Sequence, residues 1–140
     1  CSTYRVSEHW QTVVLTRWCP WLAEMQPGMF CEISKELARE KGIANGDAVI
    51  VKSPRGSVEA TAIVTARFKP LNIDGNIIHE VGIPWHFGWI TTVGRKYNPG
   101  DKKPEVYTHG DAANLLTSTI GDPNTMIPES KAFMVNVVKK

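Results

Sequence analysis

Five polar residues near the start of the chain carry side chains suited to a flat, charged ligand. Arg5 is a permanent cation, and Glu8, His9, Trp10 and Gln11 follow closely after it. Guanidinium, imidazole, indole and amide groups can together contact the edge of a heteroaromatic ring and the oxygens of an attached phosphate. The same residues could instead lie on a partly exposed strand with mixed side chains. Residue types alone leave both interpretations open.

A second candidate is a long polar segment, residues 110–131, which is rich in Gly, Asp, Asn, Thr and Pro. Such residues turn the backbone and leave N–H groups and short side chains available. A loop of this length inside one domain is uncommon unless it is functional or disordered. The side chains that could line a site for a polar, anionic ligand are Asn114, Asp122, Asn124, Thr125 and Lys131. An ordinary surface loop is the competing interpretation.

A third candidate is the aromatic segment of residues 84–89. Trp85 and Phe87 flank His86, and Gly88 follows. This composition predicts a pocket wall, although aromatic side chains also pack in cores without binding anything.

The sequence contains no self-contained catalytic set. It lacks the Gly-x-Gly-x-x-Gly dinucleotide fingerprint and the Gly-x-Ser-x-Gly nucleophile elbow. The spacing from His79 to His86 fits no standard zinc site. Cys19 and Cys31 lie in apolar company, which disfavours a reactive thiolate. These absences favour a binding module over an enzyme that works alone.

The elements that must position these residues are mostly short strands. Residues 35–41 predict one helix, with Ser34 as N-cap and Gly42 as the stop. We predict strands over residues 13–16, 48–53, 58–66, 77–83 and 132–138, and an irregular apolar segment over residues 17–22 packed against the core. We assign the helix and the hairpin after it to the scaffold, without a catalytic role. With no βαβ rhythm, the pattern favours a compact, mainly β barrel.

The bulk properties describe one globular domain over residues 1–140. A net charge of +2 does not indicate a nucleic-acid partner, and no apolar run has membrane-spanning length. Three cysteines without a Cys-x-x-Cys pair predict reduced, structural thiols. The chain starts at Cys1 without a signal-peptide pattern, from which we expect a piece of a longer protein.

Three stretches together resemble the C-terminal domain of the large subunit of molybdenum- or tungsten-dependent formate dehydrogenases, which belong to the molybdopterin oxidoreductase superfamily. The stretches are residues 4–12 (Tyr-Arg-Val-Ser-Glu-His-Trp-Gln-Thr) with Thr16-Arg17, residues 37–56 with Leu37-Ala38, Gly42-Ile43, Gly46-Asp47 and Gly56, and residues 110–133 with Gly121-Asp122-Pro123-Asn124-Thr125 and Pro128-Glu129-Ser130-Lys131. The resemblance covers essentially the whole chain. It implies a double-psi β-barrel with a few short helices that holds molybdopterin guanine dinucleotide.

The resemblance also implies site residues and partners. The family's cofactor contacts fall on Arg5, Val6, His9, Trp10, Gln11, His86, Asn114 and Lys131. The parent enzyme would convert formate to carbon dioxide, with molybdenum or tungsten on the cofactor. The partners implied are the preceding domains of the same subunit, including an iron–sulfur domain, and electron-transfer subunits, in a prokaryotic cytoplasm or periplasm. Neither nucleic acid nor direct membrane contact is implied.

The family's metal-ligating cysteine or selenocysteine and its cluster-binding cysteines belong to earlier domains and match nothing here. We therefore expect the isolated domain to be inactive and without cofactor. Three alternatives stay open: the same domain of a nitrate or S-oxide enzyme, a stand-alone β-barrel interaction domain, and self-cleavage at Gly56-Ser57 as in the aspartate α-decarboxylases, which share the barrel.

Overall fold

A six-stranded mixed sheet forms the centre of the protein. The computed structural model describes residues 1–13, 15–85, 87–88, 90–91, 107–108 and 110–140. In sheet order the strands are β1 (Ser2–Tyr4), β7 (Val81–Pro84), β2 (Phe30–Ser34), β4 (Ser57–Thr65), β3 (Ala48–Lys52) and β10 (Asn136–Lys139). The β1–β7 and β2–β4 pairs are parallel, and the other neighbours are antiparallel. Two ribbons, β5 (Leu71–Ile73) with β6 (Asn76–Ile78) and β8 (Ile90–Thr91) with β9 (Tyr107–Thr108), lie outside this sheet.

The mainly β class predicted from the sequence is confirmed, but the double-psi barrel is not. The strand order begins at β1 and ends at β10, so the sheet is open within the described part of the chain. Closing a barrel requires the two end strands to bond each other or to be bridged by further strands. None of the helices among the described residues has the length and apolar composition needed to cross a bilayer.

Helix α2 (Lys35–Lys41) forms where the sequence predicts it. The Ser34 side chain accepts a hydrogen bond from the backbone N–H of Leu37 at 3.0 Å, which satisfies one donor of the first turn. Gly42 ends the helix with a φ of 63°, a left-handed conformation that glycine adopts without strain. Leu37 and Ala38 are buried against the sheet. The helix thus covers the core beside β2.

The β3–β4 hairpin also confirms its prediction, to within one or two residues at the ends. Buried and exposed residues alternate along both strands, and Val49, Val51 and Val58 face the core. Central strands β2 and β7 supply Ile33 and Ile83, which are fully buried. One face of the sheet therefore carries the hydrophobic core.

The N-terminal third differs from its prediction. The strand expected over residues 13–16 is not found at its described residues: Val13 has a φ of 70°, outside the strand region, and Thr16–Trp18 form the 3-10 turn η1. Residue 14 lies outside the described residues. The segment after it is helix α1 (Pro20–Met25), because a proline fits the first helical position. Trp18 and Trp21 are 67% and 80% exposed, so the prediction that this segment packs against the core was wrong.

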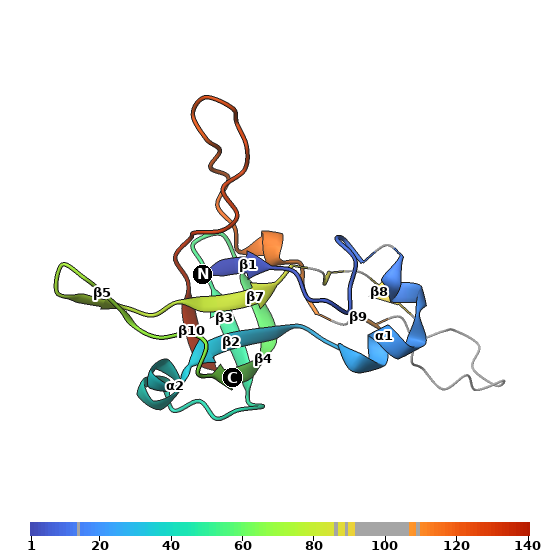
Figure 1. The fold of residues 1–140 in the computed structure, drawn as a ribbon, viewed down its shortest axis with the longest axis horizontal. Coiled ribbons are helices and arrows are strands. Elements are labelled where there is room, and N and C mark those ends of the chain that lie inside the picture. The colour runs from blue at the N-terminus through green and yellow to red at the C-terminus, as the bar shows by residue number, and fades with distance from the viewer. Residues whose placement is uncertain (14, 86, 89, 92–106, 109) are drawn as a thin grey trace.

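The strand expected over residues 77–83 is divided. The backbone changes its hydrogen-bonding partner at His79 and Glu80. Before them β6 pairs with β5 in the ribbon, and after them β7 pairs with β1 and β2 in the central sheet. The β5–β6 ribbon projects from one side of the sheet, away from α1 (Figure 1). All of its residues are exposed. A uniform apolar pattern cannot reveal that a strand switches partners.

A buried carboxylate ties β1 to β2. Glu32, 7% exposed, accepts a hydrogen bond from the Tyr4 hydroxyl at 2.7 Å and forms an ion pair with Arg67. Burial, followed by the hydrogen bond to Glu32, raises the pKa of Tyr4, so its hydroxyl remains a donor at neutral pH. These contacts fix the strand that leads into Arg5.

The three cysteines are free thiols, as predicted, but Cys19 is exposed, so the prediction that it lies in apolar surroundings was wrong. Cys31 is fully buried on β2, and burial raises the pKa of its thiol to about 12. A thiol of that pKa is not a nucleophile at neutral pH.

The loop of residues 118–130 stands out from the sheet, orange-red in Figure 1. Asp122 Oδ1 accepts hydrogen bonds from the backbone N–H groups of Thr125 and Asn124, at 2.8 and 3.0 Å, and from the Thr125 hydroxyl. The bonds from Thr125, then the bond from Asn124, lower the pKa of Asp122. The carboxylate thus holds the tip of this loop as a turn.

We expect this turn to open in acid. A carboxyl whose folded-state pKa lies below its unfolded value stabilises the turn above the unfolded pKa, and this stabilisation is lost as the pH falls through the folded pKa. An NMR pH titration should therefore show the Thr125 amide shifting with the Asp122 carboxyl. Asp122→Ala should abolish that transition, whereas a Thr125 shift that persists in this variant would contradict the assignment.

Candidate anion-binding site

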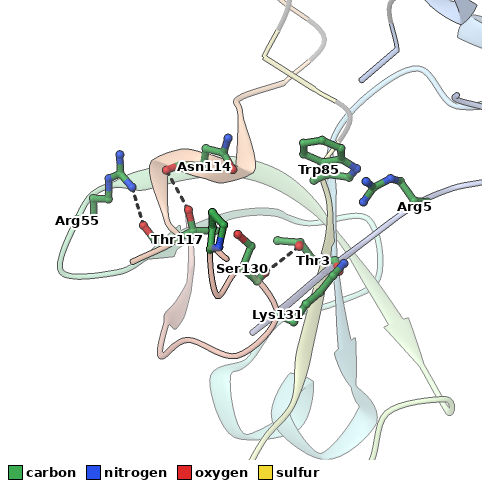
Figure 2. Close-up of a pocket in the computed structure, with 9 residues that line it drawn as sticks. Thr3, Arg5, Arg55, Trp85, Asn114, Thr117, Ser130 and Lys131 are labelled. Carbon is green, nitrogen blue, oxygen red and sulfur yellow. Dashed lines mark hydrogen bonds between the residues drawn. The ribbon is translucent and has the colours of Figure 1, made fainter. Parts of the chain in front are cut away.

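A cavity of about 460 Å³ lies where the first residues of the chain meet the late loop (Figure 2). It is lined by Thr3, Arg5, Arg55, Trp85, Asn114, Thr117, Pro128, Ser130 and Lys131. Thr3 and Arg5 come from β1 and the segment after it, Arg55 from the β3–β4 turn, and Trp85 directly follows β7. Asn114 and Thr117 come from the 3-10 turn η2 (Ala113–Leu115) and the residues after it, and the remaining residues come from the late loop. Its volume is within the range of small-molecule sites.

Hydrogen bonds between the first and the late residues build one wall. The Thr3 hydroxyl donates to the Ser130 carbonyl at 2.8 Å, and the Lys131 ammonium donates to the Thr3 carbonyl. The backbone nitrogen of Cys1 donates to the Phe133 carbonyl at 2.7 Å. Residues more than a hundred positions apart in sequence therefore form a single surface.

Two cations lie together on this wall. The Arg5 guanidinium carbon is 4.1 Å from the centre of the Trp85 ring, a cation–π contact that orients the exposed arginine. Desolvation, followed by the positive charge of Arg5, lowers the pKa of Lys131. An anion bound between them would offset this repulsion and raise the pKa of Lys131 again.

The opposite wall combines the β3–β4 turn with η2. Arg55 Nη1 donates to the Thr117 carbonyl at 2.9 Å, and the Thr117 hydroxyl donates to the Asn114 carbonyl at 3.4 Å. Figure 2 shows Arg55 and Asn114 on this side of the cavity, opposite the side that holds Arg5 and Lys131. The Asn114 amide offers both donors and an acceptor to a ligand.

The charge of the lining distinguishes this cavity from its neighbour. Arg5, Arg55 and Lys131 line it without any Asp or Glu among the lining residues. An adjacent cavity of about 420 Å³ shares Lys131 but is also lined by Asp122 and Glu129. The first cavity is therefore suited to a phosphate-bearing or other anionic ligand.

The structure brings three of the predicted site residues together and places others elsewhere. Arg5, Asn114 and Lys131 line the cavity, whereas Val6, His9, Trp10 and Gln11 do not. His9 is 3% exposed, and its Nε2 and Nδ1 lie 3.0 Å from the Gln26 carbonyl oxygen and 3.2 Å from the Thr16 hydroxyl oxygen. Within this structure His9 holds its loop against α1. His86 lies outside the described residues.

Sequence reasoning missed Arg55, because its hairpin was assigned to the scaffold. The available signal was a cation inside the tight turn Ser53-Pro54-Arg55-Gly56, where a solvent-exposed arginine is not needed for folding. The prediction that the aromatic segment forms a pocket wall is confirmed for Trp85. Among the described residues, no group of three or more His, Cys, Asp or Glu side chains is placed to hold a metal ion.

Together, the mixed sheet and the cationic cavity define a mainly β binding domain for an anionic ligand. The chain belongs to the Molydopterin dinucleotide binding domain family, which matches residues 1–134. The formate dehydrogenase subunit alpha of Megalodesulfovibrio gigas is 56% identical over 139 residues, covering 99% of this chain and 12% of that protein. The nitrate reductase of Symbiobacterium thermophilum is 44% identical over 69 residues, covering 49% of this chain and 9% of that protein.

A solved structure shares the fold. Acetylene hydratase from Pelobacter acetylenicus superposes with a TM-score of 0.69 at 13% identity, covering 99% of this chain and 18% of that one. The chain thus spans about an eighth of the length of the formate dehydrogenase relative that it matches.

Proposed function

We propose that this domain binds molybdopterin guanine dinucleotide through the cationic cavity, as part of a larger formate dehydrogenase. The observation that carries the proposal is the convergence of Arg5, Arg55 and Lys131 on one cavity whose lining has no carboxylate. The cofactor's phosphates need such cations, and its heterocycle needs an amide such as Asn114. The donor set therefore fits the cofactor that the family binds.

Each residue has a part in this proposal. Arg5 and Lys131 contact phosphate oxygens, and Asn114 pairs with a polar ring edge. Val6, His9, Trp10, Gln11 and His86 remain predicted contacts to parts of the cofactor that extend beyond the cavity. When bound, the cofactor supplies a molybdenum or tungsten centre for two-electron transfer.

The proposed whole enzyme oxidises formate to carbon dioxide and passes electrons through an iron–sulfur domain to other subunits. Its support is the formate dehydrogenase relative, which aligns with 99% of this chain, whereas the nitrate reductase aligns with 49%. We further propose that the open sheet is the frame of a double-psi barrel. The two parallel pairs within an otherwise antiparallel sheet support this arrangement.

Replacing Asn114 with leucine in the full-length enzyme tests the proposal. The variant should leave a polar edge of the bound cofactor unpaired, at a cost of about 1–3 kcal/mol, or roughly a 5- to 150-fold loss of affinity. Pterin released by acid and measured by fluorescence should fall accordingly. Asn76→Leu, the same change on the exposed β5–β6 ribbon, should keep full occupancy. Equal occupancy in both variants would reduce Asn114 to a turn residue.

A further inference from the structure

We propose that Arg55, in the turn between β3 and β4, has two roles in this site: it contacts the anionic ligand, and it helps to position η2, which carries Asn114. The inference rests on the proposed function. It adds to the site Arg55 of the β3–β4 hairpin, an element that the sequence analysis assigned to the scaffold alone. Its support is the geometry of the turn, of the guanidinium and of the backbone that the turn touches.

The turn itself is held at three points. The Ser53 hydroxyl accepts from the backbone N–H of Arg55 at 3.1 Å and of Gly56 at 3.3 Å, and the Ser53 N–H donates to the Gly56 carbonyl at 2.8 Å. Arg55 therefore extends from a fixed backbone. Less conformational entropy is lost on binding when a side chain starts from such a base.

The guanidinium then bridges the turn and the segment that follows η2. One N–H group donates to the Thr117 carbonyl at 2.9 Å, and Arg55 still lines the cavity. A guanidinium carries five N–H donors in a planar fork, so this bond leaves others for the oxygens of an anion. A lysine has one nitrogen, which cannot span the same two positions equally well.

Backbone packing joins the same two segments. A Cβ added at Gly56 would lie 2.9 Å from the carbonyl oxygen of Leu115, within η2. Only a residue without a side chain allows the turn to approach so closely. Because Asn114 precedes Leu115 in η2, the position of Asn114 depends on the contacts of Arg55 and Gly56.

The experiment measures binding of inorganic pyrophosphate by titration calorimetry, using the full-length protein prepared without its cofactor. Arg55→Gln should weaken binding about 10- to 100-fold, as expected for loss of a charge-assisted contact. Arg55→Lys should recover only part of that loss. Arg39→Gln, on the exposed face of α2, is the matched control and should bind like the unmodified protein. Thermal melts identify any variant that fails to fold.

A second measurement separates the effect of positioning η2 from the effect of the Arg55 charge. In the cofactor-loaded protein, Gly56→Ala keeps all three cations but moves η2, so pterin content should fall although pyrophosphate binding falls less. Full recovery by Arg55→Lys, or normal pterin content in Gly56→Ala, would overturn the positioning role.

The reference variant Arg5→Gln separates a failure of the role inferred for Arg55 from a failure of the proposed function. If Arg5→Gln weakens pyrophosphate binding and Arg55→Gln does not, the inference about Arg55 is wrong and the proposed function stands. If neither variant weakens it, the cavity is not an anion site and both are wrong.

Discussion

Replacing Ile33 with alanine should lower the free energy of unfolding by about 2–5 kcal/mol. Ile33 is fully buried on β2, the strand that lies between β4 and β7. The truncation removes apolar contacts and leaves a cavity that the surrounding sheet cannot fill by relaxing freely. Chemical denaturation of the domain, monitored by tryptophan fluorescence, measures the difference.

Ile63→Ala is the matched control. Ile63 lies on β4 in the same sheet but is 39% exposed. The same chemical truncation at this position should cost less, since part of the side chain already contacts water. An equal loss in both variants would mean that the core does not lie on the face described above.

Neutralising Arg5 and Lys131 together should give the largest loss of cofactor. Each charge-assisted contact is expected to contribute about 1.5–3 kcal/mol, so the double variant Arg5→Gln, Lys131→Gln should retain little cofactor at the concentrations of a cell. The pterin and metal contents of the purified full-length enzyme measure the loss. The formate oxidation proposed for the full-length protein should fall in proportion to cofactor content.

A double variant at two exposed lysines outside the cavity, Lys52→Gln with Lys69→Gln, controls for total charge. It should keep normal cofactor content. Because Lys131 also donates to the Thr3 carbonyl, a thermal melt must accompany the assay. A folded double variant of Arg5 and Lys131 with full pterin content would refute the proposed site.

The sequence predicted best what depends on neighbouring residues. Helix α2 follows from Ser34 and Gly42 at its two ends, and the β3–β4 hairpin follows from alternation across a short turn. The failures concern contacts with distant segments. Trp18 and Trp21 were expected in the core, since aromatic side chains are usually buried, but no periodic pattern fixed which face they occupy.

The site was predicted only in part, because its residues can be recognised by type but their assembly depends on contacts between distant segments. Arg5, Asn114 and Lys131 could be named as candidates by residue type, and the resemblance supported them. That they line one cavity follows from the parallel pairing of β1 with β7 and from the bond between Thr3 and Ser130, which no local rule predicts. Arg55 was missed because a turn arginine looks like any other surface charge.

The closure between the first and the late residues also sets the order in which the domain can be completed. Thr3 and its partner Ser130 are 127 positions apart, and Cys1 and Phe133 are 132 apart. At about 5–20 residues per second, a ribosome takes roughly 6–25 s to make the intervening chain. During that time β1 and the wall that holds Arg5 lack their late partners. Non-local contacts of this kind slow folding, so we expect the wall that holds Arg5 to be completed only after Ser130 and Phe133 have been synthesised.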